Sequence, residues 1–234
     1  MNAKLFSISL LAAGVLLASA SQSNASGYTL TYLGTLGGDY SWVHAINNSG
    51  QVVGESNTTL GGTTHATIWN GTIWNGTALH TPTVLGTLGM GPSYASGINA
   101  AGQVVGGMTA FGMHYATIWN GTTPTELGDL MESGYGYGGG HPSGINNSGQ
   151  VVGQSATTTS VDSAMHATIW NGTTPTDLGT LGGNDSVAFG INNASQVVGL
   201  SATLGSSVWH PEGLALGALR VLLELKQWYG DSLC

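Results

Sequence analysis

The ten residues GINNSGQVVG at positions 144–153 recur along the chain with few changes, and this recurrence decides the fold. The related blocks are AINNSGQVVG (45–54), GINAAGQVVG (97–106) and GINNASQVVG (190–199), so successive blocks are spaced by 52, 47 and 46 residues. Self-similarity at such a period is typical of proteins built from stacked copies of one supersecondary unit. The sequence therefore predicts a four-repeat domain over residues 28–210.

Each repeat has the pattern of four short antiparallel strands joined by hairpins. In the third copy, 143–146 and 150–153 flank an Asn-Asn-Ser-Gly turn, because Asn and Gly tolerate left-handed backbone angles. The β-branched and aromatic run 166–170 indicates a third strand that ends at an Asn-Gly turn, and 176–178 begins a fourth. The predicted fold class is all-β.

The second strand of every repeat places two valines side by side, as at Val151 and Val152. Adjacent side chains of a strand point to opposite faces, so both faces of these sheets are expected to be buried. Sheets of four strands covered by copies of themselves are the blades of a β-propeller, here with about four blades. A β-solenoid of stacked coils is the alternative.

The two ends of the repeat region leave the closure of such a propeller open. Residues 28–33 have the pattern of a lone fourth strand that could join the last blade, whereas 214–217 match the same position of the last repeat. The apolar tail 211–234 is therefore predicted to be either a helix or a closing strand.

The N-terminus has the pattern of a secretion signal. Lys4 precedes an apolar run at 5–18, and small residues suitable for cleavage follow, which predicts a signal peptide over 1–20, with 25 as an alternative end. The run is too short for a membrane span, so no span is expected in the mature chain. The predicted location is secreted or cell-surface, with the periplasm as an alternative.

Charge excludes several classes of partner. The chain has 11 acidic and only 3 basic residues, a formal net charge of -8, and no Lys or Arg between residues 5 and 219. Nucleic-acid binding depends on basic residues that neutralise phosphates, so nucleic acid is excluded as a partner. The single cysteine, Cys234, cannot form an intramolecular disulfide.

The blocks LGTLGG (178–183) and GINNSGQVVG, together with the His-Ala pair that opens the third strand, resemble the bacterial extracellular repeats of the HAF family. The resemblance covers roughly residues 28–210 and implies an exported protein. Thr67, Thr117 and Thr168 stand where the family usually has Phe. The resemblance implies nothing specific about an activity.

The tryptophans of the third strands recur once per repeat. A histidine lies four residues before the tryptophan in the first and third repeats and five before it in the second, and the fourth has Gly205 there. A metal needs three or four ligands around one point, and residues spread one per repeat do not converge, so no metal is expected at His65, His114 and His166. The tryptophans at the common position are predicted to be core residues rather than sugar-stacking platforms: Trp69, Trp119, Trp170 and Trp209. No catalytic residue and no cofactor are predicted.

One segment departs from the repeat. The distance from the second leucine of the LGTL block to the strand isoleucine is ten residues in three copies, but fifteen between Leu130 and Ile145. The extra residues fall in 131–141, which contains Tyr135, Tyr137 and His141. Function in repeat proteins tends to lie in such departures, so these three residues are the predicted ligand loop.

These observations predict a binding or surface-interaction module rather than an enzyme, with a glycan or another extracellular polymer, or a protein, as its partner. One alternative is a glycan-cleaving hydrolase that uses Glu126, Asp129 or Glu132, since such enzymes normally need two positioned acids. Another is a purely structural surface protein. The sequence leaves the oligomeric state open.

Overall fold

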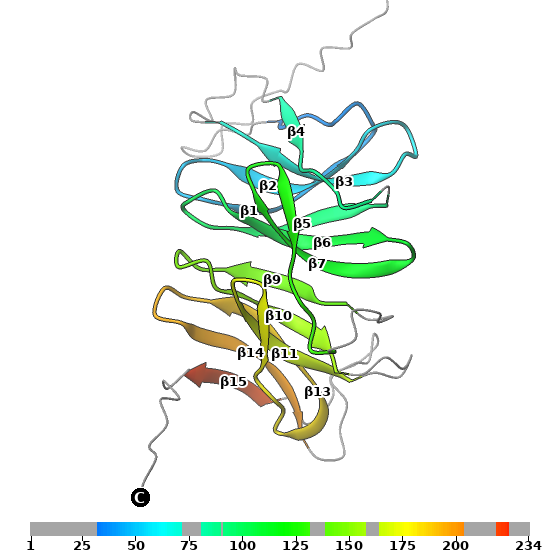
Figure 1. The fold of residues 1–234 in the computed structure, drawn as a ribbon. Helices are drawn as coiled ribbons and strands as arrows, with labels where there is room; N and C mark the ends of the chain where they lie inside the picture. Colours follow the sequence, from blue (N-terminus) through cyan, green and yellow to red (C-terminus); the bar gives the residue numbers. More distant parts are fainter. Residues whose placement is uncertain are drawn as a thin grey trace, which may run out of the picture.

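The computed structural model describes residues 32–71, 81–89, 91–131, 139–157, 164–203 and 219–224, the last of these as backbone. All regular structure in these residues is β, arranged as three four-stranded antiparallel sheets and one three-stranded sheet (Figure 1). The described residues contain no helix that is long and apolar enough to cross a membrane. The all-β class and the repeated four-strand unit predicted from the sequence are confirmed.

The strands of each sheet are neighbours in chain order. Sheet 1 contains β1 (Ser41–Ile46), β2 (Val52–Asn57), β3 (Thr64–Trp69) and β4 (Pro82–Val84). Sheet 2 contains β5 (Ser93–Ile98), β6 (Val104–Ala110), β7 (Met113–Asn120) and β8 (Thr123–Glu126). Sheet 3 contains β9 (His141–Ile145), β10 (Val151–Ala156), β11 (Met165–Asn171) and β12 (Thr174–Asp177). Sheet 4 contains β13 (Gly182–Ile191), β14 (Gln196–Thr203) and β15 (Leu219–Glu224).

The first asparagine of each recurring block closes the turn between the first two strands. In sheet 2, Asn99 Oδ1 accepts hydrogen bonds from the backbone N–H groups of Ala101 and Gln103, and Asn99 Nδ2 donates to Gln103 Oε1 at 2.8 Å. Gln103 Nε2 in turn donates to Asn120 Oδ1 at the end of β7. The turn glycine, Gly102, has a φ of 79°, which favours glycine. The Asn, Gly and Gln of the block are therefore structural.

Packing between sheets explains the two valines of the block, and a β-bulge explains its final glycine. Val53 and Val104 lie in one buried cluster between sheets 1 and 2, while Val105 and Val151 lie in the next, so the two valines of each strand face opposite neighbours. The register of β5 and β6 shifts between Ala95 and Gly97, which brings the backbone of the first strand close to Gly106. A Cβ there would overlap the Tyr94 carbonyl oxygen, so only glycine fits.

The four sheets lie one behind another, each packed face to face on the next (Figure 1). A chain of side-chain hydrogen bonds joins their turns: Nδ2 donates from Asn47 to the Asn99 carbonyl (3.0 Å), from Asn99 to the Asn146 carbonyl (3.1 Å), and from Asn146 to the Asn192 carbonyl (3.1 Å). We call these four residues the asparagine ladder. Because its bonds connect neighbouring sheets rather than strands of one sheet, the ladder fixes how the sheets stack.

A closed ring of blades is not seen in the described part of the chain. Sheets 1 and 4 lie at opposite ends of the row in Figure 1, and each of the three core clusters joins only sheets that are neighbours in the row. The β-propeller and the β-solenoid both stay predictions.

The tail supplies a strand, one of its two predicted alternatives, but at a position in the sheet that the sequence did not predict. β15 pairs with β14 in the register that places Leu223 opposite Val197. In sheets 1 and 2 the residue opposite the equivalent valine is the tryptophan of the third strand. β15 therefore occupies the third-strand position, which the sequence had assigned to a segment with Trp209. Trp209 and 214–217 lie outside the described residues.

Candidate functional site

The tryptophans at the common position are buried between sheets. Trp69, Trp119 and Trp170 are fully buried, and each lies in the third strand of its sheet. Trp119 Nε1 donates to the Gly86 carbonyl and Trp170 Nε1 to the Gly128 carbonyl, both at 2.6 Å, so the indole groups tie each sheet to the LGTL block before it. Fully buried faces do not offer platforms to a sugar, so these three residues act as the predicted core.

The repeated histidines stay on separate sheets. His65 lies on β3, His114 on β7 and His166 on β11. His166 Nδ1 lies 2.7 Å from Asp177 Oδ2, and His114 Nδ1 lies 3.2 Å from Thr109 Oγ1. Within the described ranges, no three His, Cys, Asp or Glu side chains gather closely enough to hold a metal ion.

A polar hollow lies where the insertion rejoins the repeat, on the seam between sheets 2 and 3. Glu126 and Asp129 line it together with His114. The rest of its wall comes from neighbouring positions of β7 and of the two flanking loops: Met113, Tyr115, Ala116, Leu127, Gly139 and Gly140. The hollow has about 10 Å³ of free space, about enough for one water molecule, so a ligand would reach it with a single group.

Two glycines at the end of the insertion allow its backbone to pack closely against β7. A Cβ on Gly139 would overlap the His114 carbonyl oxygen, and a Cβ on Gly140 would lie 2.8 Å from Ala116 Cβ and from the Trp170 ring. In the corresponding position of sheets 2 and 4, Ser93 and Ser186 accept a hydrogen bond from the preceding sheet. The insertion thus replaces a structural serine with backbone that packs directly on β7.

The two carboxyl groups of the hollow hold protons more tightly than usual. Desolvation by burial raises the pKa of Glu126, and the nearby charge of Asp129 adds to the effect. Burial also raises the pKa of Asp129, with a backbone hydrogen bond at Met131 acting in the opposite sense. No lysine or arginine lies in residues 5–219, so neither residue type in that range balances the charge of the two acids. The hollow therefore presents two carboxyl groups, which are hydrogen-bond acceptors when ionised.

His141 lies beside the hollow, at the first position of β9. Its ring centroid is 5.5 Å from that of His114, and its Nδ1 lies 3.2 Å from the Tyr94 hydroxyl. Burial lowers the pKa of His141, and His114 lowers it further. When the Tyr94 hydroxyl donates to Nδ1, the neutral imidazole carries its proton on Nε2. The His141 ring then has an N–H donor at Nε2.

The structure joins residues that the sequence had treated separately. His141, from the predicted ligand loop, lies beside His114, which lines the hollow together with Glu126 and Asp129, the acids that had been considered for a hydrolase. Tyr135, Tyr137 and Glu132 lie outside the described residues. His114 was grouped with the repeated histidines although it lies one residue further from its tryptophan. Tyr115 occupies the repeated register, opposite Met108, as His65 lies opposite Ser56. The extra residue between His114 and Trp119 was the signal.

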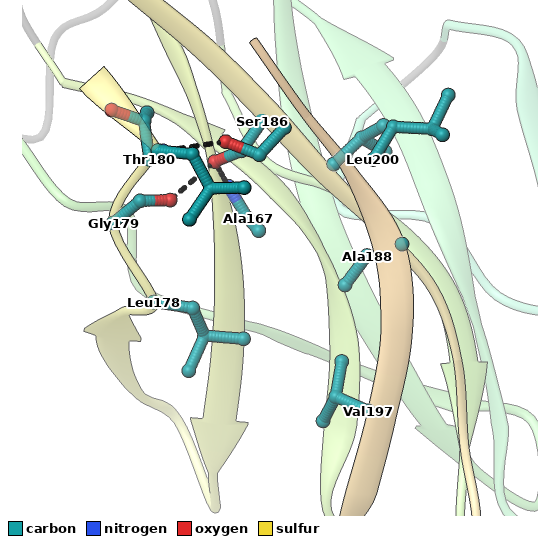
Figure 2. Close-up of a pocket in the computed structure, with 12 residues that line it drawn as sticks. Ala167, Leu178, Gly179, Thr180, Ser186, Ala188, Val197 and Leu200 are labelled. Carbon is teal, nitrogen blue, oxygen red and sulfur yellow. Dashed lines mark hydrogen bonds between the residues drawn. The ribbon is translucent and has the colours of Figure 1, made fainter. Parts of the chain in front are cut away.

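A second hollow, between sheets 3 and 4, is structural (Figure 2). It has about 40 Å³ of free space, whereas ligand pockets are typically about 300–1,000 Å³. Ser186 Oγ accepts from the Ala167 N–H at 2.8 Å and donates to the Gly179 carbonyl at 2.6 Å, as the dashed lines show. Leu178, Ala188 and Val197 complete an apolar wall. With the serine hydroxyl already paired, this hollow is a gap in sheet packing.

Comparisons of the chain with models of protein families, with curated proteins and with solved structures found no match.

Proposed function

We propose that this chain is an exported binding module that holds an uncharged extracellular polymer, most simply a glycan, at the hollow formed by Glu126, Asp129 and His114. The observation that supports this most is that the hollow lies where the chain departs from its repeats. The recurring residues are used in packing the sheets, as the asparagine ladder and the buried tryptophans demonstrate.

The chemistry of the hollow suits sugar hydroxyl groups. Carboxyl oxygens accept hydrogen bonds from hydroxyls, and a neutral imidazole can donate one. A polyanion is a poor ligand, because the chain has a net charge of -8 and the hollow contains two acids. The predicted signal peptide and the resemblance to the HAF repeats both support export, and an exported module meets glycans outside the cell.

The raised pKa values of the two acids support a second candidate, a glycan-cleaving hydrolase. A general acid must be protonated near the working pH, and burial together with a neighbouring carboxylate is how enzymes achieve this. In that reaction Glu126 would be the proton donor and Asp129 the second carboxylate.

A glycan screen followed by titration tests the proposal. The purified chain is expected to retain at least one glycan without releasing product. Glu126→Gln is then expected to weaken binding about tenfold or more, because a hydrogen bond to a charged group contributes about 1.5–3 kcal/mol. Asp177→Asn is the matched control, since Asp177 pairs with Thr168 in sheet 3 as Glu126 pairs with Thr117 in sheet 2. Shortened glycans in the product would favour the hydrolase, and a screen without binding would refute both.

A further inference from the structure

The two ends of the row of sheets present complementary halves of the interface that the chain repeats internally. The carbonyls of Asn99, Asn146 and Asn192 each accept an Nδ2 from the preceding sheet, but among the described residues the Asn47 carbonyl accepts only from the Gly50 N–H. At the other end, Asn192 Nδ2 donates to Gln196 Oε1 within its own turn, and the described residues provide no acceptor for it on a following sheet. The first residue of the ladder, Asn47, therefore presents a carbonyl acceptor at one end, and the last, Asn192, presents a side-chain amide donor at the other.

The apolar positions of the internal interfaces are exposed at these ends. Val53, Val105 and Val152 are each fully buried under the next sheet, whereas Val198 in sheet 4 is 47% exposed. On sheet 1, Ile46 is 62% exposed, although its counterpart Ile98 packs against the core between sheets 1 and 2. The outer face of sheet 1 is also hollowed along Val43, Ile46 and Val52.

The first tryptophan lacks a hydrogen bond that its counterparts make to the preceding LGTL block. Trp69 is fully buried, yet its Nε1 has no hydrogen-bond partner among the described residues. In sheets 2 and 3 that nitrogen donates to the glycine of the preceding LGTL block, whose leucine is held by the sheet before it: Leu85 N–H donates to the Ala66 carbonyl. At Trp69 the equivalent glycine is Gly34, and no described sheet precedes it.

The sequence before sheet 1 has the pattern of a fourth strand. TLTYLGTL (29–36) matches TPTVLGTL (81–88) and TPTDLGTL (174–181), whose first halves form β4 and β12. Leu36 N–H donates to Ser56 Oγ at 3.0 Å, as Leu181 N–H does to Ser201 Oγ at 2.8 Å, so the block joins sheet 1 in the usual way. A fourth strand pairs with the sheet before its block, and sheet 4 has three strands among the described residues.

We propose that the outer face of sheet 1 packs on the outer face of sheet 4 of a second copy of this chain. The second copy is required because sheets 1 and 4 of one chain lie at opposite ends, with sheets 2 and 3 between them (Figure 1). Asn192 Nδ2 then donates to the Asn47 carbonyl of the next copy. Such a head-to-tail interface is heterologous, so copies form either a ring or a filament.

Size-exclusion chromatography with light scattering tests this with two variants that each block one end. The wild-type chain is expected at a mass of two or more copies. Ile46→Asp and Val198→Asp are each expected at the mass of one copy, because each places a charge in the apolar contact. An equimolar mixture of the two is expected to contain dimers, since each variant keeps the end that the other has lost. Phe111→Asp is the control: Phe111 is exposed at the turn between β6 and β7 and faces neither end.

Three results would overturn the proposal. A wild-type chain of single-copy mass means that the ends meet within one chain or stay free. An assembly that both variants leave intact uses another surface. A mixture that stays monomeric means that the two faces do not meet each other. If the aspartate variants prove unfolded by circular dichroism, Ile46→Ser and Val198→Ser give the same three readings.

Discussion

At the scale of single residues, the ladder asparagines do two things at once. Asn99 is buried and hydrogen-bonds its own turn through both side-chain atoms, and its Nδ2 also reaches the Asn146 carbonyl. A buried polar group is stable only when it is paired, so the side chain demands the turn and the neighbouring sheet together.

Asn99→Ala is expected to lower the free energy of unfolding by about 3 kcal/mol, because it removes several buried hydrogen bonds worth about 0.5–1.5 kcal/mol each. Asn192→Ala is the matched control: the exposed Asn192 makes the same bonds within its turn, without a described bond to a following sheet, so a smaller loss is expected. Denaturant unfolding of both variants in the Ile46→Asp background, in which copies are not expected to associate, measures this. Equal losses would mean that the bond between sheets contributes nothing.

The pH dependence of stability should reveal the acids of the hollow. A carboxyl group whose pKa is raised in the folded state stabilises the fold below its unfolded pKa, and this stabilisation is lost as the pH rises through the folded pKa. Glu126 and Asp129, whose pKa values are raised by burial, should therefore reduce stability as the pH rises from about 4 towards neutrality. His141 has a lowered pKa, so it acts in the opposite sense and reduces stability as the pH falls below 6.5.

Melting temperatures from pH 4 to 7 separate these effects. Glu126→Gln is expected to be more stable relative to wild type at pH 7 than at pH 4, because the glutamine does not ionise. Parallel curves for the two proteins would contradict the raised pKa of Glu126.

At the scale of elements, the sequence predicted the strands that its periodic patterns mark, and it failed where the pattern was replaced. The first three repeats follow the predicted order because turn chemistry, paired valines and the tryptophan strand agree with one another. In the fourth repeat, an SVW echo at 207–209 favoured a strand there, yet β15 from the tail pairs with β14. The choice between two apolar segments depends on long-range pairing, which a local pattern does not specify.

Deleting residues 133–137 tests whether the insertion is needed for binding but not for folding. The deletion restores the ten-residue spacing of the other repeats, so the β circular dichroism signal is expected to be retained while glycan binding is lost. The deletion of 72–76, which removes one copy of the TIWNG duplication in the first repeat, is the control of equal length. A loss of binding in the control alone would place the ligand on sheet 1.

At the scale of the whole molecule, the chain separates packing from recognition. Residues that recur are buried between sheets or paired within turns, and the hollow lies where the insertion and the extra residue of β7 depart from the repeat. The sequence analysis predicted the ligand loop and named the two acids as an alternative site. Their common place beside one hollow depends on how sheets 2 and 3 pack, which the sequence does not show. His114 joined them only in the structure, because one inserted tyrosine shifts it out of the common register.

The most direct measurement compares two variants of β7 by titration with a glycan selected in the screen and by denaturant unfolding. His114→Ala removes an exposed side chain of the hollow, so it is expected to weaken binding with little loss of stability. Trp119→Phe removes the hydrogen bond to Gly86 and part of a buried ring, so it is expected to lower stability by about 1–3 kcal/mol and leave binding unchanged. If Trp119→Phe stays folded but loses binding while His114→Ala binds normally, the repeated residues are the site, and the separation of packing from recognition is wrong.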